Sequence, residues 1–179
     1  MFDIDKLGCL EHYRGDSPYV VVTENVRVIT TYAFKGRTDI KEVVISDKVK
    51  VIQDRAFMDC TSLEQVRLPL SAEYIGEKCF QNSGLKELVI PGGTEMIRFA
   101  AFRRCPKLET VFIEDGVKRL TDTCLEFCPK LHKVYIPASV IDIGENTFYA
   151  DNDVIIIAPK GSYAEMYAVR HSIPFIERK

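Results

Sequence analysis

The chain has 179 residues, of which 46% are hydrophobic and 28% are charged, a composition that suits a folded core with a charged surface and excludes a disordered chain. Its net charge of −2 leaves no excess of cations to neutralise phosphates, so we expect no nucleic-acid partner. Residues 1–16 lack the basic and apolar segments of a secretory signal, and no apolar run approaches the ~18 residues of a membrane helix. We therefore expect no membrane insertion and, for the sequence as given, a cytoplasmic protein; a cell-surface location would require a processed fragment.

Hydrophobic residues recur along most of the chain at a nearly constant period. The clearest column is Phe34, Phe57, Phe80, Phe102, Leu125 and Phe148, at spacings of 23, 23, 22, 23 and 23 residues. The single missing residue lies between Gln81 and Leu85, and the array begins near residue 19. Self-similarity at such a period predicts a solenoid, in which each unit buries its apolar side against its neighbours.

One repeat reads V-x-x-I-x-x-x-A-F-x-x-C-x-x-L-x-x-V-x-I-P. The V-x-I segment alternates as a half-buried strand does, and the following V-x-x-I fits a turn into a second short strand. The segment A-F-x-x-C-x-x-L has the spacing of one helical turn. We expect the strands of successive repeats to stack in parallel, about 4.8 Å apart.

The repeat resembles the BspA-like class of leucine-rich repeats, whose units carry I-x-x-x-A-F-x-x-C-x-x-L and end in I-P. The pattern is almost complete in residues 52–69 and 97–113, and the resemblance extends over residues 13–176. It implies a right-handed leucine-rich repeat solenoid of the α/β horseshoe class that is mostly β, with six to seven coils of 22–23 residues, a parallel strand ladder, short helical turns and a C-terminal capping helix. We expect one domain over 1–179, made of an N-terminal cap or truncated repeat (1–18), the repeats (19–158) and a C-terminal cap (159–179).

Both ends carry apolar residues that fit caps, which an open solenoid needs to cover its exposed strand edges. Ser162 and Glu165 form a capping-box pattern that starts a short helix, and Pro174 would stop it. The residues expected to cover the first coil are Phe2, Ile4, Leu7 and Leu10, and those expected to cover the last are Tyr163, Met166 and Tyr167.

The residues that most often carry chemistry fall into structural columns or lie far apart. Five of the six cysteines occupy two repeat columns, so we interpret them as buried core thiols rather than disulfides or metal ligands. His12, His132 and His171 are spread over the predicted rod, and no nucleophile–base pair is visible among them. An enzyme would require a cleft with clustered titratable groups, which a straight rod does not offer. We therefore expect no catalytic site, no metal site and no cofactor.

The segment Arg14-Gly15-Asp16 matches the integrin-recognition tripeptide and sits just before the first predicted strand. The alternative interpretation is an ordinary entry turn, because arginine and aspartate are common turn neighbours and the resemblance accounts for the glycine as part of a Tyr-x-Gly turn. An adhesive role for the tripeptide would require that the protein be exported.

The middle residue of each V-x-I segment is expected to point away from the core. This outward stripe consists of Val21, Val44, Arg67, Val89, Phe112 and Tyr135, and a polar column flanks it at Glu42, Gln65, Glu87, Thr110 and Lys133. Apolar and aromatic surface with a polar margin is typical of a binding patch. The alternative is that such residues simply stack well on a pleated surface.

We predict a non-enzymatic protein-binding module that uses this face, through Val44, Arg67, Val89, Phe112 and Tyr135, with a protein as partner. The resemblance implies a second hypothesis, a microbial cell-surface adhesin that binds host matrix or cell proteins. A third is a structural spacer with no engaged face.

Overall fold

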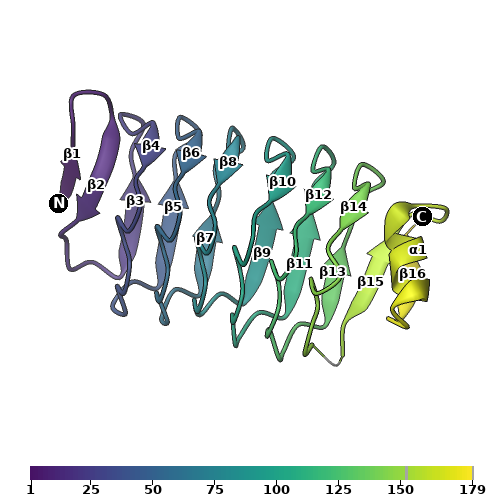
Figure 1. Ribbon diagram of the computed structural model, residues 1–179. Helices are drawn as coiled ribbons and strands as arrows, with labels where there is room; N and C mark the ends of the chain where they lie inside the picture. The colour runs from purple at the N-terminus through teal and green to yellow at the C-terminus, as the bar shows by residue number, and fades with distance from the viewer. Residues whose placement is uncertain (152, 179) are drawn as a thin grey trace.

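The computed structural model describes residues 1–151 and 153–178; Asn152 and Lys179, which belong to the predicted repeat array and C-terminal cap, lie outside the described residues. The chain winds into coils that stack side by side, with its two termini at opposite ends of the stack (Figure 1). The predicted solenoid is confirmed.

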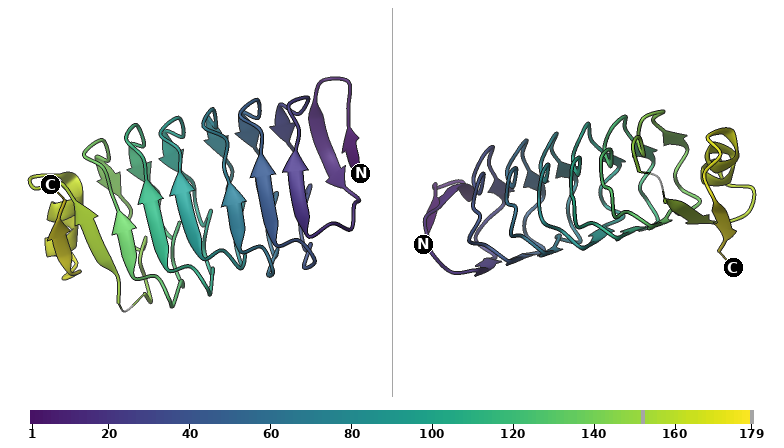
Figure 2. Two further views of the ribbon diagram at one scale, coloured as in Figure 1. Left: turned by 180° about the vertical axis from the view of Figure 1, so that it is seen from behind. Right: turned by 90° about the horizontal axis from the view of Figure 1, so that it is seen from below.

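Among the described residues, each coil except the last contributes one long and one short strand, and the last contributes a long strand without a short one. The long strands are β3 (Tyr19–Val22), β5 (Glu42–Ile45), β7 (Gln65–Arg67), β9 (Glu87–Ile90), β11 (Thr110–Ile113), β13 (Lys133–Tyr135) and β15 (Ile155–Ala158). The short strands are β4 (Val28–Ile29), β6 (Val51–Ile52), β8 (Tyr74–Ile75), β10 (Met96–Ile97), β12 (Arg119–Leu120) and β14 (Asp142–Ile143). Within each ladder the pairing is parallel and joins equivalent repeat positions, as in Val43↔Val66. The long strands form one face of the rod. This face is turned toward the viewer in the left view of Figure 2, which shows the molecule from behind relative to Figure 1.

Both ladders are interrupted at one place. Strand β7 is not a hydrogen-bonded neighbour of β9, and β8 is not a neighbour of β10, so each sheet consists of two parts. This junction contains the one short coil, in which a single residue, Gly84, separates Ser83 from Leu85 where two separate Cys60 from Leu63. A Cβ atom on Gly84 would lie 2.3 Å from the Thr61 carbonyl oxygen, so only glycine fits this tight crossing.

The A-F-x-x-C segments are successive turns rather than the predicted helical turns. Residues on both sides of the phenylalanine have left-handed backbone, for example Arg55 with φ 56° and Asp59 with φ 63°. The Phe57 N–H donates to the Cys79 carbonyl of the next coil at 2.8 Å, whereas in a helix it would donate to the carbonyl four residues earlier in its own coil. The adjacent coil therefore supplies acceptors that replace the helical bonds. Among the described residues α1 (Tyr163–Arg170) is the one α-helix.

The predicted inner columns form one continuous core. Phe34, Phe57, Phe80 and Phe102 are fully buried, and their rings stack at centroid distances of 4.6, 4.9 and 5.3 Å. The burial expected of the five cysteines in the repeat columns is also confirmed. The Cys60 thiol donates to the Phe34 carbonyl oxygen at 3.1 Å, which gives this column a polar role as well as an apolar one.

The N-terminal end is covered by an antiparallel pair, β1 (Phe2–Ile4) and β2 (Cys9–Tyr13), and β2 pairs with β4. Phe2 and Ile4 pack on the core and Leu10 is buried, as predicted. The prediction for Leu7 is wrong: it lies in the turn between the strands, and 80% of it is exposed. Tyr13 closes the first coil instead, with its ring 5.4 Å from that of Phe34.

The C-terminal end is covered by α1, which Ser162 caps by accepting from the Glu165 N–H at 3.3 Å. Tyr167 is buried and Tyr163 packs against the core, but Met166 is 60% exposed, so the prediction for Met166 is wrong. The 3.6-residue period places Ala164 and Ala168 on the buried face beside Tyr167, and Met166 on the other side. A further strand, β16 (Phe175–Glu177), pairs with β15 and was not predicted from the sequence.

Candidate interaction surface

The outward stripe lies on the solvent side of the long strands, as the alternation of V-x-I predicts. Val21 is 61% exposed, Val89 48% and Phe112 37%, whereas Val44 and Tyr135 are half-buried. The structure brings Val89, Phe112 and Tyr135 together on adjacent strands, in the registers Val89↔Phe112 and Phe112↔Tyr135.

Phe112 and Tyr135 form the aromatic centre of the stripe. Their rings stack at 4.5 Å between centroids with planes 12° apart. Each ring therefore shields one face of the other while its remaining surface stays available, and the pair forms a rigid apolar platform.

The stripe extends further than the sequence suggested. Ile157 stands opposite Tyr135 on β15, and Ile176 stands opposite Ile157 on β16. Ile157 is buried, whereas Ile176 is 52% exposed. The V-x-I register identifies Ile157 by counting, but Ile176 follows Pro174, where the repeat pattern has ended.

The interruption between β7 and β9 divides the stripe. Val44 and Arg67 lie on one part of the long-strand sheet, and Val89, Phe112 and Tyr135 lie on the other. Val66 is half-buried although its column neighbours Val43 and Leu88 are buried, because the ladder does not close beside it.

Two hollows occupy this interruption, and Val66 and Val89 line both. One, of about 350 Å³, is also lined by Arg67, Leu68, Leu70, Pro91 and Glu114. The other, of about 370 Å³, is also lined by Glu64, Gln65, Lys86, Glu87, Leu88 and Glu109. Together they form a groove between the two strands, which we call the β7–β9 groove.

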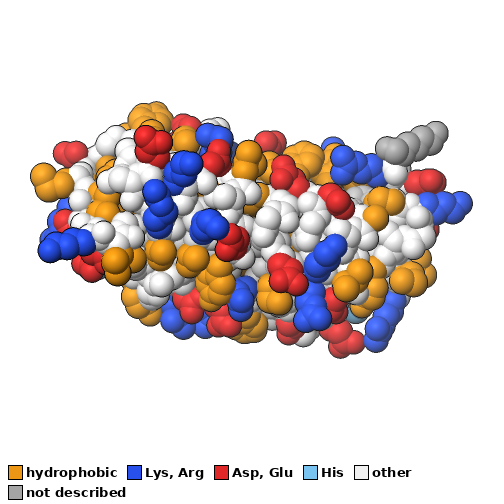
Figure 3. Space-filling model, turned by 90° about the horizontal axis from the view of Figure 1, so that it is seen from above, with side chains coloured by type: hydrophobic (Ala, Val, Ile, Leu, Met, Phe, Trp, Pro, Cys, Tyr) orange, Lys and Arg blue, Asp and Glu red, His pale blue; other side chains and the backbone are white. Residues whose placement is uncertain are grey.

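Charged groups along the groove are partly paired. The Lys86 ammonium lies 2.7 Å and the Lys107 ammonium 3.1 Å from the Glu64 carboxylate, and these contacts lower the Glu64 pKa below its usual value. Arg67 lies 3.4 Å from Asp47. Glu87 and Glu109 form no ion pair with the residues that the structure describes. Figure 3 views the stack of coils from above. On that side, acidic, basic and hydrophobic side chains are intermixed, with no large field of one charge.

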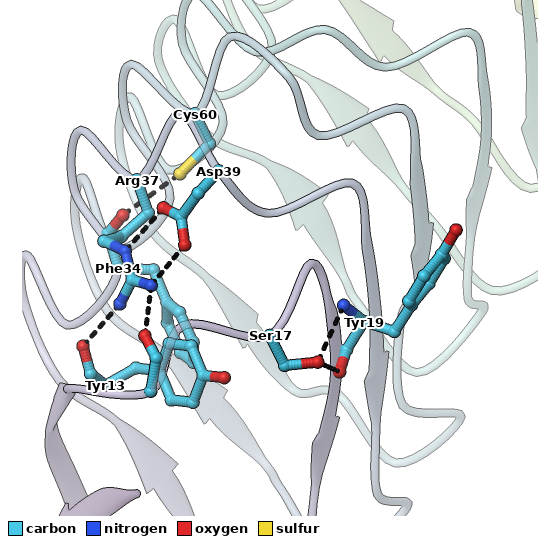
Figure 4. Close-up of polar contacts among 8 residues, drawn as sticks. Tyr13, Ser17, Tyr19, Phe34, Arg37, Asp39 and Cys60 are labelled. Atoms are coloured by element: carbon cyan, nitrogen blue, oxygen red, sulfur yellow. Dashed lines mark hydrogen bonds and ion pairs between the residues drawn. The ribbon is translucent and has the colours of Figure 1, made fainter.

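The Arg14-Gly15-Asp16 segment is part of a braced entry loop. The Arg37 guanidinium donates to the Tyr13 carbonyl at 2.8 Å and to the Gly15 carbonyl, and it pairs with Asp39 (Figure 4). A Cβ atom on Gly15 would fall 2.4 Å from the Tyr13 hydroxyl, so any other residue here would have to displace the Tyr13 ring.

The two charged side chains of the tripeptide are in different states. The Arg14 guanidinium forms an ion pair with Asp3, which raises the pKa of Arg14, and Asp16 is exposed. Gly15 thus has a structural role, as expected for an ordinary entry turn. For Arg14 to contact a partner, its guanidinium would first have to break the ion pair with Asp3.

A third hollow, of about 340 Å³, lies between the last coil and α1 and was not anticipated from the sequence. Glu145, Asp151 and His171 border it, together with Tyr149 and Tyr167. Burial raises the pKa of Asp151 to about 7, and its Oδ2 atom has no hydrogen-bond partner among the described atoms. The structure thus gathers titratable groups around a hollow at one end of the rod, although we expected a straight rod to offer no cleft with such a cluster.

The buried thiols do not resemble nucleophiles. Burial raises the pKa of Cys60 and of Cys124 to about 12, so both remain protonated at neutral pH. His132 binds the Asp153 carbonyl at 3.0 Å, and His171 stacks on Tyr167 at 4.1 Å, so each imidazole has a local structural contact. Residues 1–151 and 153–178 contain no cluster of three or more His, Cys, Asp or Glu able to hold a metal ion.

No helix in the described part of the chain is long and apolar enough to cross a membrane.

Residues 27–155 match the family model of the BspA type leucine rich repeat region, in six copies. No curated protein matches the chain in sequence. Among solved structures, the pneumococcal vaccine antigen PcpA is similar with a TM-score of 0.87 and 20% identity, over 98% of this chain and 46% of that one.

Two further structures share the fold at similar identity. The leucine-rich repeat protein of T. pallidum has a TM-score of 0.63 and 20% identity, over 98% of this chain and 94% of its own. A leucine-rich cell surface protein of Faecalibacterium prausnitzii has a TM-score of 0.61 and 22% identity, over 94% of this chain and 40% of its own. The chain spans less than half of PcpA and of the F. prausnitzii protein.

Proposed function

Because the chain belongs to the BspA type leucine-rich repeat family, we propose that it is a non-enzymatic protein-binding module and that the outward stripe of the long-strand sheet is its binding surface. The residues proposed to contact the partner are Val44, Arg67, Val89, Phe112 and Tyr135. A protein partner suits a flat sheet face with an apolar centre and a polar margin.

The observation that carries this proposal is the stacked pair of Phe112 and Tyr135 on the solvent side of the sheet. If the stripe only met water, its central positions would be expected to be polar. Instead, a rigid aromatic platform stands between Val89 on one side and Ile157 on the other. Rigid aromatic groups lose little conformational entropy on binding, which is why they dominate many interfaces.

The test is an affinity capture from the native cell with the wild type and with a Phe112→Asp plus Tyr135→Asp variant. We expect the wild type to retain a partner that the double variant loses, because two carboxylates cannot be buried in an apolar interface without a large penalty. The matched control is Tyr32→Asp plus Phe99→Asp, which charges two aromatic side chains that are each 43% exposed but lie outside the long strands.

Three outcomes separate the hypotheses. Loss of the partner only in the stripe variant supports the proposed surface. Equal retention by both variants refutes the face assignment, and the absence of any specific partner supports the structural spacer. Circular dichroism and thermal unfolding of each variant show whether a loss reflects binding or folding.

A cell-surface adhesin is the second candidate, and the fold shared with a leucine-rich cell surface protein of F. prausnitzii favours it. Fractionation of the native cell decides whether the protein reaches the surface. The role of the tripeptide is tested by cell attachment to the immobilised protein with Asp16→Glu, since Asp16 is exposed and has no structural partner among the described residues. Unchanged attachment would exclude an adhesive role for Arg14-Gly15-Asp16.

A further inference from the structure

The junction between β7 and β9 is bridged by backbone bonds near the starts of the two strands. The Lys86 N–H donates to the Glu64 carbonyl at 3.2 Å, and the Gly84 N–H donates to the Cys60 carbonyl at 3.3 Å. These bonds hold the two coils together, so the junction has no space for a further backbone. The hollow near the ends of the strands is therefore a place for a side chain.

This hollow, which we call the Glu114 hollow, is the one of about 350 Å³ that Arg67 and Glu114 line together with five apolar residues. Its volume is at the small end of the range for binding sites, about 300–1,000 Å³. Val66 and Val89 form part of its floor. Most of the surface that an occupant meets is therefore apolar, and the polar groups stand at the rim.

The two charged residues of the Glu114 hollow are in different states. The Arg67 guanidinium lies 3.4 Å from Asp47, which follows β5, so its charge is directed away from β9. Glu114 is exposed and forms no ion pair with the described residues. One of its carboxylate oxygens accepts from the Gly92 N–H at 3.2 Å, which holds the group beside the end of β9. The free charge of the hollow is therefore negative.

The ring of Phe112 provides an aromatic face beside the hollow. One face of the ring stacks on Tyr135 with the planes 12° apart, so the opposite face is turned toward β9. The neighbour on β9 is Val89, which is smaller than a ring and 48% exposed, so this face is partly uncovered. Elsewhere on the molecule a guanidinium covers such a ring, as Arg98 does 4.2 Å over Tyr74. No described cation lies over Phe112.

The apolar floor, the free carboxylate and the uncovered ring together select a cation on an apolar stem. An apolar side chain in the hollow would remove water from the Glu114 carboxylate without pairing it, and an acidic one would be repelled. An arginine stem packs on apolar surface while its charged group stays at the rim. The planar guanidinium stacks on an aromatic face and pairs with a carboxylate through two N–H groups, which a lysine ammonium does not match.

We propose that the Glu114 hollow binds an arginine side chain of the partner protein. The stem of this arginine lies over Val66 and Val89, and its guanidinium stacks on the free face of Phe112 and donates to the Glu114 carboxylate. The inference rests on the proposed function and names the chemistry of the partner at the centre of the same face.

The experiment selects peptides from a phage-displayed, disulfide-constrained library on the full wild-type chain, after depletion on a Val89→Phe variant. Phenylalanine at this position extends the Phe112 stack over the hollow, so depletion removes the peptides that bind elsewhere. Val21→Phe is the matched control, because Val21 is 61% exposed on the same stripe but lies on β3. The recovered peptides should be enriched in arginine and should bind Val21→Phe within about twofold of the wild type.

A double-mutant cycle tests the contact between the guanidinium and Glu114. Each peptide is synthesised with arginine or with citrulline, its neutral isostere, and fluorescence anisotropy measures binding to the wild type and to Glu114→Gln. Glutamine keeps an acceptor for the Gly92 N–H and removes the charge. Citrulline should weaken binding to the wild type by about tenfold or more. Glu114→Gln should weaken binding of the arginine peptide by about threefold to tenfold, and by less at high salt. The citrulline peptide should bind both proteins within about twofold, because its pair is already absent.

Glu87→Gln is the control for charge alone. Glu87 is exposed and forms no ion pair with the described residues, but it lines the other hollow of the groove. Its substitution should weaken binding of the arginine peptide by less than about twofold, since it removes only a distant charge. A larger loss from Glu87→Gln than from Glu114→Gln would overturn the assignment of the carboxylate.

Other results would also overturn the proposal. These are recovery of no peptide, recovery of peptides without arginine, and equal losses of the arginine and citrulline peptides on Glu114→Gln. If circular dichroism shows that Val89→Phe does not fold, the cycle sorts the peptides instead, because it needs only Glu114→Gln.

The two proposals fail in different ways when a partner is captured from the native cell. A partner that the Phe112→Asp plus Tyr135→Asp variant loses, but that Val89→Phe and Glu114→Gln both retain, leaves the proposed function standing without this inference. A partner that all of these variants retain overturns both.

Discussion

The inner phenylalanine column and the outer pair of Phe112 and Tyr135 have almost the same stacking geometry in very different surroundings. The inner rings of Phe57 and Phe80 are 4.9 Å apart and fully buried, whereas the outer rings are 4.5 Å apart and Phe112 is 37% exposed. The strand spacing of about 4.8 Å imposes the stacking distance in both places. Stacking therefore does not distinguish a buried core ring from a ring proposed to bind a partner, and the decisive difference is how much apolar surface is already removed from water.

This difference predicts the largest effect on stability. Phe80→Ala should lower the free energy of unfolding by about 3–5 kcal/mol, because the ring lies between two other buried rings and leaves a cavity that the stacked coils cannot close. Phe112→Ala, the matched control, should cost about half as much or less, since Phe112 is 37% exposed and stacks on one ring rather than between two. Urea denaturation followed by circular dichroism measures both. Similar costs for the two variants would mean that the outer pair is part of the stabilising structure rather than a free surface.

The fold was largely predictable because the inner columns repeat. Each buried position is repeated in five or six coils, so its period outweighs local ambiguity and identifies the core, the long strands and the free cysteines. The turns were less predictable. Spacing within A-F-x-x-C suits one turn of helix, and nothing in a single repeat shows that the next coil will compete for the same N–H groups.

The ends and the groove depended on packing that no period describes. Leu7 and Met166 are apolar residues near the caps, yet one lies in a turn and the other on the outer side of α1. The missing residue near Gly84 was visible in the sequence, but its consequence was not, because the chain could have absorbed it in a turn without opening the ladder. The hollow bordered by Asp151 and His171 forms only when α1 packs on the last coil.

For the candidate site, the sequence correctly predicted direction but not extent. Alternation in V-x-I is a property of the strand, so Val89, Phe112 and Tyr135 point outward as expected. Ile176 comes from a strand beyond the repeats, and the division of the stripe follows from the open ladder.

The cysteine column offers a smaller effect that sharpens the comparison between packing and polar contacts inside the core. Cys60→Ala should cost about 1–2 kcal/mol, since it removes the thiol contact with the Phe34 carbonyl and leaves a small void. Cys60→Ser should cost less than Cys60→Ala, because it keeps a donor, and Ser83 already occupies this column in the next coil. Equal costs, measured by urea denaturation, would show that only the volume of the thiol matters.

Asp151 occupies the same column at the last coil, where the core meets solvent, and it predicts an effect that depends on pH. Burial raises its pKa from an ordinary 3.8 to about 7, the nearby Glu126 adds to this, and the Cys128 N–H that it accepts opposes it. Between these two pH values the folded chain holds a proton that the unfolded chain has released, so this group's contribution to stability falls as the pH rises from about 4 to about 7 and is constant above that. Asp151→Asn keeps an acceptor for the Cys128 N–H and cannot ionise, so its melting temperature should exceed that of the wild type by a margin that grows over this pH range and then levels off. The difference between the two melting curves measures this, and a difference that does not change with pH would mean that Asp151 is already ionised in the folded chain.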